Sequence, residues 1–189
     1  MERVYRSDPE AQQKLKTTLG QSGVGAIAME YLPQGSHCSH LNAMVEQVLA
    51  DHPRFEGGYD LLVVDYADKM DGPGDNTYDR YRSVYNGLRQ IAVDARVRVL
   101  TASQIKDLEN KRTPGAGDLS DSRWKGRTAD TVITMWKDED GDAEERYFHV
   151  AKHRGPGVGT VVGPVLTDLA HARMGPLPAS LLDDDDLDL

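Results

Sequence analysis

Two polar residues in this sequence directly follow apolar runs, at positions where chemistry on a phosphate could take place. Asp65 follows the run Leu61–Val64, and Gln104 ends the segment 97–104. Both runs are typical of buried strands in a parallel sheet. Because open α/β sheets bind ligands at the carboxyl ends of their strands, Asp65 is placed to hold Mg²⁺ for a nucleotide, and the Gln104 amide to sense a phosphate or position a water molecule. The simpler alternatives are an Asp that caps the following turn and a Gln that serves as an ordinary turn residue.

A second candidate set consists of two cations near the C-terminal end. Lys152 and Arg154 flank His153 and precede the glycine turn 155–157. Long basic side chains at such a turn could reach a phosphate or another subunit, and the planar guanidinium suits a phosphate presented by a neighbour. The alternative for Arg154 is an ordinary surface arginine.

Length, charge and cysteine content restrict the class of protein. The chain of 189 residues is long enough for one domain with a sizeable core, and its single Cys38 excludes an internal disulfide and a cysteine-based zinc site. The sequence has no apolar stretch of membrane-span length and no signal peptide, so we expect a cytoplasmic protein. A formal net charge of −9 argues against a simple basic nucleic-acid-binding module, although a locally basic segment covers residues 106–127.

Hydrophobic periodicity predicts alternating strands and helices, followed by strands alone. We expect helices over residues 8–19, from the N-cap Ser39 onward, and over 78–95, together with strands over 25–31, 61–64, 97–104, 130–136, 146–152 and 159–166. The long polar stretch 105–128 is typical of a functional or disordered loop. This order predicts an α/β fold, with a mainly parallel sheet flanked by helices and an antiparallel extension at the C-terminal edge.

Taken in order, four segments resemble the C-terminal ATPase domain of DnaB-like replicative helicases, particularly phage versions, which has a RecA-type fold. LLVVDYADKM resembles the Walker B strand of that family, and VRVLTASQ resembles its third motif. LSDSRWKGRTADTVITMW resembles the DNA-contacting loop with the strand after it, and FHVAKHRGPGVGTV resembles the Lys-x-Arg motif. The resemblance covers roughly residues 27–174. It implies a partial RecA-like helicase domain over residues 1–175, followed by a disordered acidic tail over 176–189.

The resemblance implies a role for each candidate residue. Asp65 would coordinate Mg²⁺, and Gln104 would couple the γ-phosphate of ATP to the DNA-binding loop. Lys152 and Arg154 would act on nucleotide held by the adjacent subunit. The loop that would contact the backbone of single-stranded DNA contains Lys111, Arg112, Arg123, Lys125, Gly126 and Arg127. Trp124 is an addition to the family pattern, and it either stacks on a base or anchors the loop.

One family element is absent from these 189 residues. A phosphate loop of the form G-x-x-x-x-G-K-[ST] needs a Gly-Lys pair, and the sequence contains none. The resemblance therefore implies the rear portion of the ATPase domain, without its first strand and phosphate loop. We expect poor ATP binding by the chain alone, because a backbone nest and a lysine hold the β- and γ-phosphates. ATP and Mg²⁺ would be used only in a complemented assembly. Its partners would be single-stranded DNA, a homo-oligomeric ring or the missing N-terminal portion, and replisome proteins.

The sequence leaves several alternatives open for what the chain is and does. The chain could be one piece of a split gene, a truncated reading frame, or a subunit that lends its cations to a neighbour. It could also be a catalytically inactive RecA-like interaction module that assembles with a complete ATPase. A third possibility is an unrelated α/β enzyme that uses Asp65 with a histidine, either His149 or His153.

Overall fold

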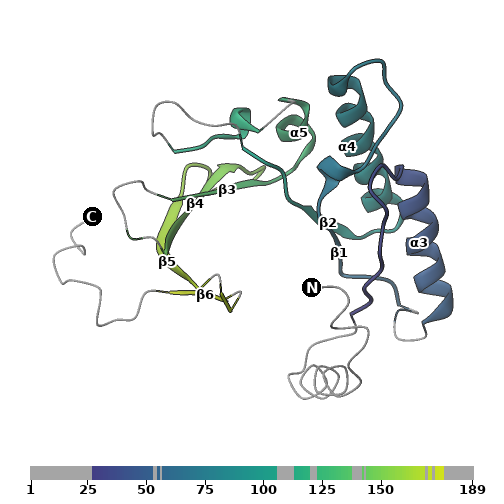
Figure 1. Cartoon of the computed structure of the whole chain (residues 1–189), viewed down its shortest axis with the longest axis horizontal. Helices are drawn as coiled ribbons and strands as arrows, with labels where there is room; N and C mark the ends of the chain where they lie inside the picture. The colour runs from purple at the N-terminus through teal and green to yellow at the C-terminus, as the bar shows by residue number, and fades with distance from the viewer. Residues whose placement is uncertain are drawn as a thin grey trace.

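The strands of the computed structural model form a parallel two-stranded sheet and an antiparallel four-stranded sheet (Figure 1). The first sheet pairs β1 with β2, and the second has the order β3-β4-β5-β6. In chain order the strands are β1 (Leu61–Val64), β2 (Arg98–Thr101), β3 (Val132–Trp136), β4 (Glu145–Lys152), β5 (Val161–Asp168) and β6 (Arg173–Pro176). The predicted α/β fold with an antiparallel C-terminal extension is confirmed, and in the described residues the two parts are separate sheets.

The structure describes residues 27–52, 55, 57–105, 113–119, 123–137, 142, 144–168, 170, 171 and 173–176. The helix expected over residues 8–19, the candidates Lys111 and Arg112, and the tail from residue 177 onward lie outside these residues. The strand expected over 25–31 is wrong in its described part, because residues 27–31 are neither helical nor paired with a described strand.

In the described residues, three α-helices and two short 3₁₀ helices accompany the strands. Helix α4 starts after Asn76, whose side-chain oxygen accepts a hydrogen bond from the Asp79 amide at 3.0 Å. The expected Ser39 cap is wrong, because α3 already begins one residue earlier and has His37 at its N-cap. The helices are α3 (Cys38–Asp51), η2 (Ala67–Lys69), α4 (Thr77–Asp94), η3 (Ala116–Asp118) and α5 (Arg123–Thr128). None of the helices in the described part of the chain has the length and apolar character needed to cross a bilayer.

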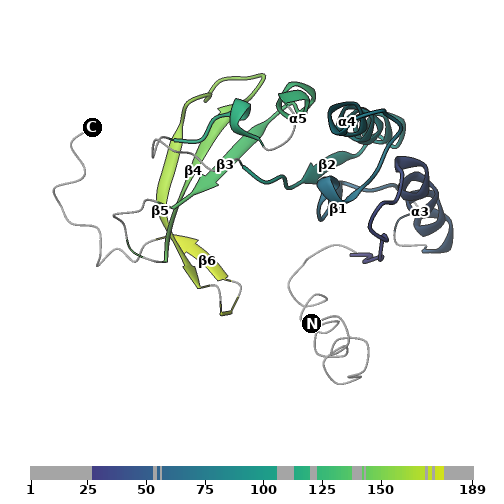
Figure 2. The ribbon, with the colours of Figure 1, turned by 45° about the horizontal axis from the view of Figure 1, so that its top comes forward.

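The hydrophobic core lies between α3, α4 and one face of the parallel sheet (Figure 2). Helix α4 contributes an apolar stripe at the predicted helical spacing, and α3 contributes residues one turn apart. The buried members from these two helices and β1 are Leu41, Val45, Val64, Val84, Tyr85, Leu88 and Ile91. This core fixes the position of the parallel sheet against the helices.

The opposite face of the parallel sheet is exposed. Successive side chains of a strand point to opposite faces, and on this face Leu61, Val63 and Leu100 are 50%, 59% and 56% exposed. We call these three residues the open face. The prediction that the strand before Asp65 is fully buried is therefore wrong, since the helices cover only one side of it.

Helices α3 and α4 approach each other closely at a glycine. A Cβ atom added to Gly87 would lie 2.6 Å from the Cys38 sulfur, so a larger residue would push the helices apart. The Cys38 thiol also donates a hydrogen bond to the Val84 carbonyl oxygen at 3.4 Å. Burial raises the pKa of this thiol.

Candidate functional site

Asp65 and Gln104 follow the carboxyl ends of two neighbouring parallel strands. The register places Val64 opposite Thr101, so both residues emerge at the same edge of the sheet. The Thr101 hydroxyl joins the two strand ends, since it donates to the Val64 carbonyl at 2.8 Å and accepts from the Ala67 amide at 2.9 Å. Both Asp65 and Gln104 are exposed, and we call this pair the strand-end edge. The prediction that both residues follow strands ending at the same edge of the sheet is confirmed, and the role of each residue stays a prediction.

The residues at the strand-end edge fit Mg²⁺ only as part of a nucleotide complex. Protein-bound Mg²⁺ usually keeps several waters and takes one or two carboxylates together with substrate phosphates. Asp65 can supply one such carboxylate from its exposed position. The described residues contain no group of three His, Cys, Asp or Glu side chains that could hold a metal ion. Among the described residues Asp65 is therefore the ligand on offer at this edge, and the phosphates would have to be held by other groups.

Directly behind this edge lies a buried cluster around Lys125, which we call the lysine cluster. The Lys125 side chain is 1% exposed, and its Nζ lies 2.8 Å from Asp68 Oδ2. It also donates to the Ser103 hydroxyl at 3.1 Å and lies 4.1 Å from the centre of the Tyr81 ring. Asp68 accepts two more hydrogen bonds, both at 2.9 Å, from the hydroxyls of Ser103 and Tyr85. One cation, one carboxylate and three hydroxyl-bearing side chains thus share a single buried site.

The electrostatics of the lysine cluster explain why a lysine is stable there. A buried ammonium loses its hydration, which an opposite charge and an aromatic face can replace. Burial, and then the charge of Asp68, raise the pKa of the Tyr85 phenol, so this group remains a hydrogen-bond donor. The expectation that Lys125 contacts DNA is wrong for this structure, because its ammonium points inward to Asp68.

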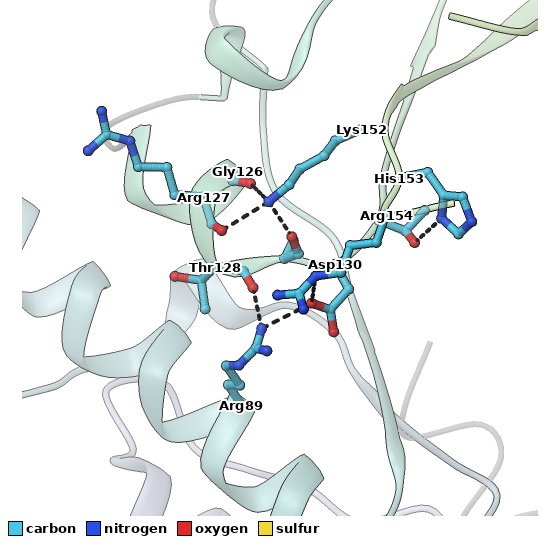
Figure 3. A network of polar contacts seen from close by, with 10 residues as sticks. Arg89, Gly126, Arg127, Thr128, Asp130, Lys152, His153 and Arg154 are labelled. Carbon is cyan, nitrogen blue, oxygen red and sulfur yellow. Dashed lines mark hydrogen bonds and ion pairs between the residues drawn. The ribbon is translucent and has the colours of Figure 1, made fainter. Parts of the chain in front are cut away.

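Lys152 holds the C-terminal end of α5 (Figure 3). Its Nζ donates to the carbonyl oxygens of Gly126, Arg127 and Ala129 at 2.8, 2.9 and 2.6 Å. An ammonium group has three N–H donors, and the last carbonyls of a helix lack partners within the helix. Lys152 therefore acts as a helix cap here, and its three donors are occupied by the backbone. The prediction that it reaches a neighbour's nucleotide does not agree with this arrangement.

Arg154 lies beside the same helix but remains at the surface. Its Nε forms an ion pair with Asp130 Oδ1 at 2.8 Å, and the side chain is 64% exposed. Arg89 contacts the same Asp130 oxygen at 3.1 Å and donates to the Thr128 carbonyl at 2.9 Å (Figure 3). This network holds Arg154 at the rim of the domain, where its predicted action on a neighbouring subunit stays a prediction.

The other candidates on α5 differ in what they contact. Gly126 is buried, and an added Cβ would lie 2.6 Å from the Ala116 carbonyl oxygen, so close packing against η3 explains this glycine. Arg127 is exposed, and Figure 3 shows its side chain extending away from Lys152. Arg123 begins the helix. Of the two described lysine and arginine side chains of α5, Arg127 is thus the one open to a ligand.

Trp124 anchors α5 on α4. Its indole N–H donates to the Asn86 side-chain oxygen at 3.3 Å, and the Arg82 guanidinium lies 4.9 Å from its ring centre. Of the two roles expected for this residue, the structure agrees with the anchor.

The two candidate histidines have partners of their own. His149 Nδ1 lies 2.9 Å from the Pro114 carbonyl oxygen, and His153 Nδ1 lies 2.9 Å from the Thr131 hydroxyl. His149 belongs to β4 and His153 directly follows β4, so both are positioned by the four-stranded sheet, whereas Asp65 follows a strand of the parallel sheet. The contacts of these described residues therefore do not form the alternative Asp-His pair.

Sequence reasoning gave no site role to Asp68 or Tyr85 and treated Ser103 only as a neighbour of Gln104 at the strand end, although a signal was present. Asp68 comes three residues after Asp65, and Ser103 directly precedes Gln104. Polar residues next to both strand ends could have suggested a shared buried partner behind the edge.

The chain is similar to known proteins in both sequence and fold. A family model described as the DnaB-like helicase C-terminal domain matches residues 21–167. A comparison with curated proteins gave no match. A solved structure titled "The Structure Of A DnaB-Like Replicative Helicase And Its Interactions With Primase" is similar at a TM-score of 0.65 and 18% sequence identity. The match covers 91% of this chain and 42% of that chain, so the present chain spans less than half of that helicase's length. At this identity the likeness shows the fold.

Proposed function

The chain belongs to the DnaB-like helicase C-terminal domain family, and on that premise we propose that it is a portion of a replicative helicase that unwinds DNA with ATP and Mg²⁺. A phosphate loop from outside these 189 residues completes the nucleotide site, because the chain contains no Gly-Lys pair. The observation that carries the proposal is the strand-end edge, where Asp65 and Gln104 follow the carboxyl ends of two paired parallel strands. In this role Asp65 is a Mg²⁺ ligand, and Gln104 senses the γ-phosphate.

The open face supports completion by a further polypeptide segment. Parallel sheets are normally covered on both faces, and two strands alone form a marginal sheet. Within the described part of the chain, the side formed by Leu61, Val63 and Leu100 is 50–59% exposed and lacks such a cover. We infer that the segment bearing the phosphate loop packs on this face, which places its phosphate-binding backbone next to Asp65.

Contacts with DNA and with a neighbouring subunit are assigned to exposed cations. Arg127 is exposed on α5, and we assign it to the phosphate backbone of single-stranded DNA in a ring assembly. Arg154 is 64% exposed at the domain rim, and we assign it to nucleotide held by the next subunit. Lys125 and Lys152 take no direct part, since both bind groups of their own chain.

Reconstitution with a phosphate-loop-bearing polypeptide tests this function. The probe is the product of the reading frame directly upstream, if it encodes G-x-x-x-x-G-K-[ST], expressed together with this chain. We expect no ATP hydrolysis by the chain alone, and DNA-stimulated hydrolysis by the assembled pair that falls by ~10³-fold in Asp65→Asn. Asp60→Asn, at an exposed acid just before β1, is the matched control.

Two results of that experiment would contradict the proposal. Hydrolysis by the chain alone that depends on Asp65 would show that no external phosphate loop is needed. Equal rates for the wild-type and Asp65→Asn pairs, with assembly confirmed by size-exclusion chromatography, would instead favour the second candidate function. This candidate is an inactive RecA-like interaction module, which the absence of a Gly-Lys pair also fits.

A further inference from the structure

We propose that Lys125 is a positioning residue, which joins α5 to the strand-end edge through the lysine cluster, so that α5 and the edge move as one body. The inference rests on the proposed function only for the statement that the link couples DNA binding at α5 to nucleotide binding at the strand-end edge. The physical link itself is a property of this chain.

The members of the lysine cluster are close in sequence to the residues of the strand-end edge. Asp68 lies in η2, three residues after Asp65, and Ser103 directly precedes Gln104. Lys125 Nζ contacts both, at 2.8 Å for Asp68 and 3.1 Å for Ser103. A displacement of α5 therefore pulls on the backbone next to each member of the strand-end edge.

The ion pair between Lys125 and Asp68 is costly to break. The side chains of Lys125 and Asp68 are only 1% and 9% exposed, and the described residues contain no buried side-chain polar atom without a partner. Separating the two leaves an unpaired charge in a poorly hydrated site, which proteins strongly disfavour. The Tyr81 ring lies on α4, and the two hydroxyls that bind Asp68 belong to Tyr85 on α4 and to Ser103 just after β2. These partners stay in place if α5 moves away, so the displaced ammonium loses them. α5 is therefore held to the strand-end edge through this buried cluster.

The chain contains its own control for this inference. Lys152 also fixes α5, but its three bonds go to carbonyls of α5 and the residues that follow it. Loss of Lys152 should loosen α5 alone, whereas loss of Lys125 should loosen α5 and the strand-end edge together. The two lysines can therefore be compared on the same helix.

Hydrogen exchange of the full chain tests the link. The amides of Ala67, Lys69 and Met70 are hydrogen-bonded and report on the segment after Asp65, and the Ala129 amide bonded to the Lys125 carbonyl reports on α5. Without denaturant, and for amides that exchange through local openings and not through global unfolding, we expect Lys125→Met to speed exchange by ~10-fold or more in both places. Under the same conditions Lys152→Met should speed it in α5 alone. Unchanged exchange of residues 67–70 in Lys125→Met, or the same pattern in both variants, would overturn the inference.

A second measurement distinguishes coupling between α5 and the strand-end edge from a purely structural role of Lys125. Oligothymidylate bound to the wild-type chain should slow exchange in α5 and also in residues 67–70, whereas in Lys125→Met it should slow exchange in α5 only. Slowing at both places in the variant would overturn the inference. Absence of any effect of oligothymidylate on the wild-type chain would count against the proposed function, while the exchange of the free chain still decides the role of Lys125. If Lys125→Met does not fold, Ser103→Ala takes its place and is expected to give the same pattern with a smaller change.

Discussion

Replacing Lys152 by methionine should cost the chain a large share of its stability, although the residue is only the last one of strand β4 and its partner is a short helix. A hydrogen bond to a charged group contributes about 1.5–3 kcal/mol, and a cation at a helix C-terminus adds about 0.3–1 kcal/mol. The three bonds from Lys152 share one ammonium and one helix end, so their contributions do not add. We expect Lys152→Met to lower the free energy of unfolding by about 2–3 kcal/mol.

Urea denaturation followed by tryptophan fluorescence measures this loss. The chain has two tryptophans, and Trp124 on α5 and Trp136 on β3 flank the region that Lys152 holds together. Methionine keeps the apolar stem of lysine and removes only its charge and donors. Lys137→Met, at an exposed residue after β3, is the matched control and should stay within about 0.5 kcal/mol of the wild type. An equally small loss in Lys152→Met would refute the reasoning, because water would then satisfy the helix carbonyls as well as the lysine does.

Two further substitutions test the packing and the electrostatics around α5. Gly126→Ala should destabilise the chain by about 1–3 kcal/mol in the same assay, because the new Cβ would lie 2.6 Å from the Ala116 carbonyl oxygen. Gly117→Ala is the control, since its Cβ would meet nothing within 4 Å. Equal losses of stability in both variants would contradict the packing argument. Burial, and then Asp68, raise the pKa of Tyr85 above its ordinary value of 10.0, so its stabilising effect is complete below pH 10 and is lost as the pH rises further. Tyr85→Phe should therefore make the free energy of unfolding fall less steeply above pH ~10 than in the wild type, and an unchanged slope would show that Tyr85 ionises normally.

Features encoded by neighbouring residues were predictable from the sequence. The helix predicted over 78–95 is observed as Thr77–Asp94, because an apolar stripe with helical period identifies itself locally. The placement of Asp65 and Gln104 after strands that end at the same edge was also predictable, since two strands joined through a helix run parallel. Strands β3 to β5 followed from short apolar segments and a glycine-rich turn, whereas β6 (Arg173–Pro176) was not predicted.

Features that depend on contacts between distant segments were not predictable. Lys125 stands in a basic run and looks like a solvent-facing cation, and only the approach of Asp68 makes its burial possible. Lys152 follows a strand, and nothing near it in the sequence indicates that it caps α5. The apolar run before Asp65 has the same composition whether one or both faces of its strand are covered, so the open face also escaped prediction.

The close approach of α3 and α4 restricts how this domain can vary in sequence. Any side chain at position 87 would collide with the Cys38 sulfur at 2.6 Å and with its Cβ at 2.9 Å. Positions 38 and 87 therefore form a pair whose combined size is limited, although they belong to different helices. Related chains with alanine at position 87 should carry glycine at position 38 or a displaced α3, and the two positions should change together during evolution.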